Sequence, residues 1–172
     1  MRDTQGARWM RWLLLSVGVI VLDLATKAWV SGAFELGESR EVTPFFNLVL
    51  AHNTGAAFSF LAGAGGWQRW LFAAVTVAIS IALVVGLRRH GDKPLLATAF
   101  ALVLGGALGN LYDRLTLGYV VDFLDFHWAR SHFPAFNVAD SAITIGVALL
   151  LWDSVKPASR IAAPEAARQE KP

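Results

Sequence analysis

Four long apolar segments constrain the fold of this chain more than any other feature. They cover about residues 12–29, 67–87, 95–111 and 137–155. Because a helix rises about 1.5 Å per residue, each segment can cross the roughly 30 Å hydrocarbon core of a bilayer. Of the 172 residues, 55% are hydrophobic and only 16% are charged, whereas a soluble domain has roughly 25% charged residues. The sequence therefore predicts an all-α integral membrane protein with four transmembrane helices.

The first apolar segment has two interpretations. Three arginines precede it, as in a cleavable signal peptide, but the apolar run continues into Asp23 and Lys27 without a small-residue cleavage site. We interpret it as a retained helix. A single membrane domain then covers residues 1–156. Segment 157–172, rich in Ala, Pro and charge, is predicted to be a disordered cytoplasmic tail.

The distribution of basic residues predicts the orientation. Ten of the 15 Lys and Arg residues lie in the N-terminal tail, in the loop between the second and third segments, or in the C-terminal tail. Cytoplasmic loops carry an excess of these residues, so both termini are predicted to be cytoplasmic. Loops 30–66 and 112–136 then face outward. The net charge of +2 reflects this topology and gives no indication of a nucleic-acid partner.

The two outward loops contain more than linker sequence. An apolar, β-rich run at 42–50 precedes the turn-forming residues Asn53, Thr54 and Gly55, which predicts a small sheet at the membrane surface. The Asn53 side chain is expected either to bond the backbone of a substrate or to hold its own loop. Because both loops and two helix ends lie on one face, we expect function there.

Polar residues near the outer helix ends are spaced for contact. Asp23 and Lys27 are four residues apart, on one helix face, and we interpret them as a structural ion pair. Asn110 and Arg114 have the same spacing and would present an amide and a guanidinium to one volume. The glycines within 105–110 are expected to allow close helix packing.

Asp122 lies in the sequence YVVDFLDF, three residues before Asp125. A helix would place the two carboxylates on one face, and a strand would place them on opposite faces. Burial among valine and phenylalanine is predicted to raise the pKa of Asp122, which favours a protonated acid near neutral pH. Asp122 is the candidate acid, with Asp125 as the alternative.

Asp140 lies in the first turn of the fourth apolar segment, in the sequence FNVADS. One interpretation is structural: Asn137 is a natural N-cap, and Asp140 at position N3 completes a capping box. The other is chemical, because the helix dipole favours an anion at this end. Asp140 and Asp122 would then hold opposite protonation states, as aspartyl hydrolysis requires. The ionised carboxylate would take a proton from water while the protonated one donates to the scissile carbonyl.

Other catalytic chemistries lack their usual residues. The chain has no cysteine, and its four histidines form no His-Glu-x-x-His motif. No Gly-x-Ser-x-Gly motif occurs either. We therefore predict a site that uses neither a metal nor a cofactor.

Five sequence blocks together resemble the lipoprotein signal peptidase family, also called signal peptidase II. In chain order they are DLATK (23–27), NTGAAF (53–58), GGALGNLYDR (105–114), VVDF (120–123) and FNVADS (136–141). The resemblance implies four transmembrane helices with a small extracytoplasmic β-cradle. It also implies an aspartyl endopeptidase that cuts a diacylglyceryl-modified prolipoprotein immediately before its lipidated cysteine.

The resemblance also assigns roles to individual residues. The catalytic aspartates of the family fall on Asp122 and Asp140, and the supporting residues fall on Asn53, Asn110, Arg114 and Asn137. The implied location is the bacterial cytoplasmic (inner) membrane, with the active site at the outer face. The expected partners are the lipidated substrate and membrane lipid, with no nucleic acid, and we expect a monomer.

Three other functions fit parts of the pattern. A transporter would also carry carboxylates near apolar helices, but the chain shows no internal repeat and no matched helix breaks. A presenilin-like protease is suggested by LYD at 111–113, yet the Gly-x-Gly-Asp motif is missing. In a noncatalytic scaffold, every aspartate would only cap a helix or form an ion pair.

Overall fold

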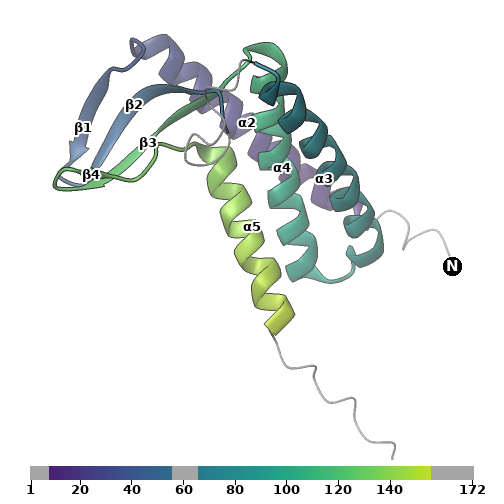
Figure 1. The fold of residues 1–172 in the computed structure, drawn as a ribbon. Coiled ribbons are helices and arrows are strands. Elements are labelled where there is room, and N and C mark those ends of the chain that lie inside the picture. Colours follow the sequence, from purple (N-terminus) through teal and green to yellow (C-terminus); the bar gives the residue numbers. More distant parts are fainter. Residues whose placement is uncertain (1–7, 56–65, 156–172) are drawn as a thin grey trace, which may run out of the picture.

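A computed structural model describes residues 8–55 and 66–155 of the chain. Its long helices are α2 (Met10–Ala33), α3 (Gln68–His90), α4 (Pro94–Thr116) and α5 (Val138–Val155), with a small sheet at one end of them (Figure 1). All four are long and apolar enough to cross a membrane. The predicted four-helix membrane fold is thus confirmed. The segment 157–172 lies outside the described residues.

The helices extend beyond the apolar runs that predicted them. α2 begins two residues before the expected start and ends at Ala33 instead of residue 29, and α4 ends at Thr116 instead of residue 111. The last turns of α4 contain the polar residues Asn110 and Asp113, and hydropathy alone places the end of the helix there. Both residues are buried against protein, so the helix continues past them. Gly118 ends α4, because its φ of 88° is readily adopted only by glycine.

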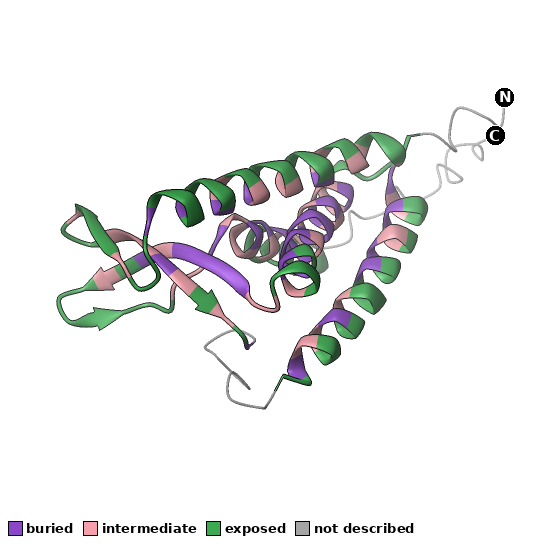
Figure 2. Cartoon of the chain, turned by 90° about the horizontal axis from the view of Figure 1, so that it is seen from above, coloured by how far each residue is buried: buried purple, intermediate pink, exposed green. Residues whose placement is uncertain are grey.

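Helix α4 lies at the centre of the bundle and packs against α2, α3 and α5 (Figure 2). Small residues make this possible, as the glycines of 105–110 predicted. A Cβ atom on Gly109 would lie 2.6 Å from Asp23 Oδ2, and one on Gly105 would lie 2.8 Å from the backbone oxygen of Ser16. The outer faces of the other helices carry exposed apolar side chains, including Leu14, Val21, Ile81 and Leu151.

The sheet is antiparallel, in the order β1 (Ser39–Thr43), β2 (Phe46–Asn53), β3 (Val120–Trp128) and β4 (Ser131–His132). The predicted sheet in loop 30–66 is confirmed. Loop 112–136 joins the sheet through β3, a segment that sequence alone left open between helix and strand. Val121 and Phe123 of β3 pack in one buried cluster with Val30 of α2 and with Phe34, the residue that directly follows α2. This cluster fixes β3, and with it Asp122, over the helix ends.

Candidate active site

A cleft of about 710 Å³ lies where β2 and β3 meet the ends of α4 and α5. One part of its wall is polar, formed by His52, Asn53, Asn110, Arg114, Asp122 and Asp140. Another part is apolar and includes Phe133, Phe136, Ile143 and Ile145. Five of the six site residues predicted from the sequence therefore line one cleft. The sixth, Asn137, is fully buried beside it.

Asp122 is held on β3 by two amide donors. Its Oδ2 accepts a hydrogen bond from Asn53 Nδ2 at 3.0 Å, and its Oδ1 accepts one from Asn137 Nδ2 at 2.8 Å. The residue is only 2% exposed. Burial, and secondarily the negative charge of Asp140, raise the pKa of Asp122 to about 7. Near neutral pH this carboxyl group is therefore present in both its protonated and its ionised form.

Asp140 forms the capping box that its spacing predicted. The backbone N–H of Asp140 donates to Asn137 Oδ1 at 2.9 Å, and Asp140 Oδ2 accepts from the backbone N–H of Asn137 at 3.3 Å. Its other oxygen, Oδ1, accepts a 2.7 Å hydrogen bond from Asn110 Nδ2. Capping does not require this second contact. The carboxylate of Asp140 thus caps the start of α5 and also lines the cleft.

Asn137 joins the two aspartates. Its oxygen caps the helix at Asp140, while its Nδ2 lies within bonding distance of Asp122 Oδ1, of the carbonyl oxygen of Val121 at 3.2 Å and of Asn110 Oδ1 at 3.2 Å. An amide nitrogen has two protons for these three acceptors. The start of α5 and the middle of β3 are therefore bound to each other through one buried side chain.

Asn53 and Arg114 both hold the residue Gly55. The backbone N–H of Gly55 donates to Asn53 Oδ1 at 3.0 Å, and its carbonyl oxygen accepts from Arg114 Nη2 at 3.1 Å. Asn53 thus holds its own loop and also donates to Asp122, and its contact with a substrate stays a prediction. His52 was missed by the sequence analysis: it lines the cleft and stacks on Tyr119 with ring centroids 3.8 Å apart, and no motif marks it.

Asp125, the alternative to Asp122, is engaged elsewhere. It accepts a hydrogen bond from Asn47 Nδ2 at 3.0 Å and lies 2.9 Å from His132 Nδ1. Residues three apart in a strand point to opposite faces, which separates Asp125 from Asp122. Asp125 is not among the residues that line the cleft.

Comparison with known proteins identifies the group to which this fold and cleft belong. The family described as "Signal peptidase (SPase) II" matches residues 15–156. The chain belongs to this signal peptidase family. A protein named "Lipoprotein signal peptidase" from Paraburkholderia phymatum is 55% identical to this signal peptidase over 145 residues, which cover 84% of this chain and 87% of that protein.

Further similarities agree with this assignment. A protein of the same name from Shewanella baltica is 56% identical over 146 residues, which cover 84% of this chain and 85% of its relative. A solved bacterial membrane enzyme, determined by the in meso method, superimposes with a TM-score of 0.77 at 35% identity, covering 89% of this chain and 94% of that one. The predicted family is confirmed, and the chain is a peptidase.

Proposed function

We propose that this peptidase removes the signal peptide from diacylglyceryl-modified prolipoproteins and cuts immediately before the lipidated cysteine. The observation that carries the proposal is the meeting of two carboxylates, Asp122 and Asp140, in one cleft beside the ends of membrane-spanning helices. The relatives named lipoprotein signal peptidases support the choice of substrate. The bacterial cytoplasmic membrane is the proposed location.

The two carboxylates divide the chemistry of hydrolysis. Asp140, at the positive end of the α5 dipole, is the ionised group. It takes a proton from a water molecule while the oxygen of that water attacks the scissile carbonyl carbon. Asp122, whose pKa is raised to about 7 by burial and then by Asp140, donates its proton to the carbonyl oxygen. Collapse of the tetrahedral intermediate breaks the C–N bond: one hydroxyl group of the intermediate returns a proton to Asp122 as the carbonyl forms again, and the proton held by Asp140 passes to the departing nitrogen. The products are a carboxylic acid on the signal peptide and a free amine on the cysteine.

The apolar lining of the cleft fits a substrate that arrives from the bilayer. Ile143 and Ile145 lie on α5, within the segment that can span the membrane, and both line the cleft. Ile145 is 54% exposed on the helix surface. A signal helix bearing acyl chains could therefore approach sideways along α5 and keep its apolar surface out of water. Asn53, Asn110, Arg114 and Asn137 are proposed to support the dyad and the bound chain.

The cleft is proposed to face outward. It lies at the sheet end of the bundle, while Arg88, Arg89 and Lys93 lie at the other ends of α3 and α4, where basic residues mark the cytoplasmic side. Both termini are then cytoplasmic. Among the described residues, both carboxylates and their amide partners come from one chain, which supports a monomeric enzyme. No nucleic-acid partner is proposed.

The test is cleavage of a defined precursor by the purified enzyme in detergent or lipid vesicles. One substrate carries a diacylglyceryl-modified cysteine, and its matched control has the same sequence with an unmodified cysteine. Mass spectrometry should detect a product that begins at the lipidated cysteine and little product from the control. A transporter or a scaffold would leave both precursors intact, and equal cleavage of both would contradict the proposed requirement for the lipid.

A further inference from the structure

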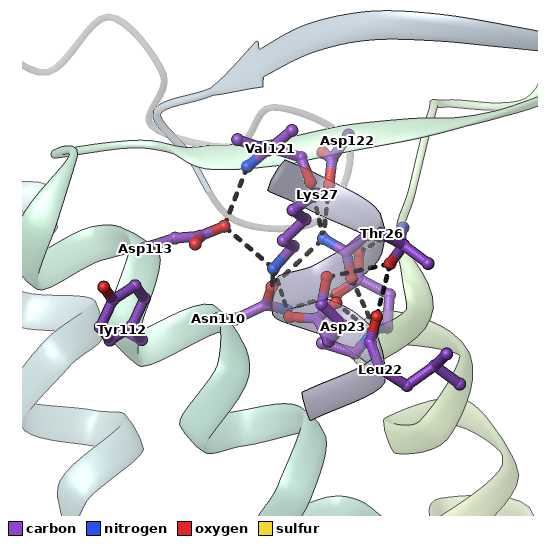
Figure 3. Close-up of polar contacts among 12 residues, drawn as sticks. Leu22, Asp23, Thr26, Lys27, Asn110, Tyr112, Asp113, Val121 and Asp122 are labelled. Atoms are coloured by element: carbon purple, nitrogen blue, oxygen red, sulfur yellow. Dashed lines mark hydrogen bonds and ion pairs between the residues drawn. The ribbon is translucent and has the colours of Figure 1, made fainter. Parts of the chain in front are cut away.

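The buried ammonium of Lys27 lies next to the candidate dyad and has three acceptors (Figure 3). Its Nζ lies 2.7 Å from Asp23 Oδ2, 2.9 Å from Asp113 Oδ2 and 2.9 Å from Asn110 Oδ1. Lys27 is 3% exposed. The ammonium therefore forms ion pairs with two carboxylates and donates a hydrogen bond to one amide oxygen, in a site away from water. The pair with Asp23 is the one that the spacing predicts, whereas Asp113 lies on another helix and was missed.

The first acceptor holds the start of α5. Asp23 Oδ1 accepts a 2.9 Å hydrogen bond from the backbone N–H of Ala139, the residue before Asp140. This N–H belongs to the first turn of the helix, where backbone donors have no partner within the helix. The absence of a side chain at Gly109 makes room for the Asp23 carboxylate. Helix α2 thus fixes where α5 begins.

The second acceptor holds β3. Asp113 Oδ2 accepts a hydrogen bond from the backbone N–H of Val121 at 3.2 Å, and Val121 directly precedes Asp122. Asp113 is itself only 2% exposed. Lys27 therefore joins two carboxylates, each of which binds the backbone one residue before a proposed catalytic aspartate.

The third acceptor sets the orientation of an amide. A lysine ammonium can only donate, so the Asn110 side chain must turn its Oδ1 toward Lys27. Its Nδ2 then points to Asp140 Oδ1, to which it donates at 2.7 Å. A reversed amide would place an oxygen against this carboxylate and would repel it. The neighbouring Nδ2 of Asn137 also approaches Asn110 Oδ1, but at the longer distance of 3.2 Å and with other acceptors to serve.

We propose that Lys27 is a positioning residue for the dyad: its ammonium sets the separation of Asp122 and Asp140 and makes Asn110 a donor to Asp140. This inference rests on the proposed function of the two aspartates. Stability alone is a weak reason to keep this ion pair, because burying such charges is costly and well-packed apolar replacements are often equally stable. Positioning of the two catalytic aspartates would explain why a buried lysine is kept together with the two carboxylates of Asp23 and Asp113.

The test removes the ammonium and keeps the charge of the cluster. The native cluster of Asp23, Lys27 and Asp113 has a formal charge of −1, and so has the double variant Lys27→Met with Asp113→Asn. The amide introduced by Asp113→Asn can still accept a hydrogen bond from the backbone N–H of Val121. The matched comparator is Asp113→Asn alone, which keeps Lys27. Both are purified, and kcat and KM on the lipidated precursor are measured per folded enzyme, with the thermal midpoint as a check of folding.

The double variant should fold with a midpoint close to that of its comparator. Its kcat should fall about 100-fold below that of Asp113→Asn, the cost of a dyad misplaced by about 1 Å, with KM nearly unchanged. Equal kcat in both would overturn the inference, as would a change in KM alone. If it does not fold, Lys27→Met with Asp23→Asn, which has the same net charge, is measured against Asp23→Asn alone, with the same expected loss of kcat.

If neither double variant that contains Lys27→Met folds, Lys27 is needed for folding, and the positioning role is overturned. Asp122→Asn is assayed beside them on the same precursor. Wild-type turnover in that variant would refute the proposed dyad itself, which is a different result from any of the Lys27 outcomes.

Discussion

Asp122 should make the folded protein less stable as the pH rises toward neutrality, and Asp122→Asn should remove this dependence. Burial and the charge of Asp140 raise the pKa of Asp122 from 3.8 to about 7. Between these pH values the folded protein holds a proton that the unfolded chain has released, so the stabilisation present below pH 3.8 is lost as the pH rises through 7. The two pKa values differ by about three, and one pKa unit corresponds to about 1.4 kcal/mol, which gives about 4 kcal/mol.

The assay measures the free energy of unfolding in detergent micelles at several pH values between 4 and 8 for wild type and Asp122→Asn. The free energy of the variant minus that of wild type should rise by about 4 kcal/mol across this range. A fixed cost arises because the amide introduced by Asp122→Asn meets the donors of Asn53 and Asn137, and this cost moves the difference curve without changing its slope. Asp125→Asn, the same change on the same strand outside the cleft, is the control.

A flat or falling difference curve would refute this reasoning, because it would mean that Asp122 ionises at least as easily in the folded chain as in the unfolded chain. The charge of Asp140 is the second cause of the raised pKa. Asp140→Asn should therefore reduce the rise without abolishing it, since burial, the larger cause, remains.

Three further predictions follow from the site. Asn53→Ala removes a donor to Asp122, so the alkaline limb of kcat/KM should move up by about one pH unit. Asn53→Asp keeps the acceptor for Gly55, and recovery of wild-type activity in this variant would favour a purely loop-holding role. Asn137→Ala removes the cap of α5, so denaturation should show a loss of about 1–2 kcal/mol and assays a lower kcat; unchanged values would contradict the described network. Activity should survive EDTA, and loss restored by one divalent metal would refute the metal-free prediction.

Local patterns predicted the parts of this protein that depend on local physics. Apolar runs located the four helices. A segment that crosses hydrocarbon must be apolar and must satisfy its own backbone hydrogen bonds, whichever helix it packs against. The spacing of Asn137 and Asp140 predicted a capping box, which needs only one turn of helix. The spacing of Asp23 and Lys27 likewise predicted a contact within a single helix.

Contacts between distant segments could not be predicted in this way. Nothing in the spacing of Lys27 and Asp113 indicates that they meet, since 86 residues separate them and their contact depends on how α2 packs against α4. The orientation of the Asn110 amide depends on the same packing. The secondary structure around Asp122 stayed open because a run of valine and phenylalanine fits a buried strand or a buried helix. Pairing with β2 settles it, since Asp122 lies opposite Ala51.

Cleavage of the lipidated precursor by Asp122→Asn, Asp140→Asn and the double variant tests the central claim most directly. Each single change should abolish turnover while the enzyme still inserts and binds the precursor, and the double variant should lose no more, because two residues that act on one water fail as a unit. If Asp140 only caps α5, Asp140→Asn would cost at most about 1 kcal/mol of stability and leave turnover nearly intact, which would contradict the dyad. Loss of turnover in Asp125→Asn, with Asp122→Asn active, would move the catalytic role to Asp125.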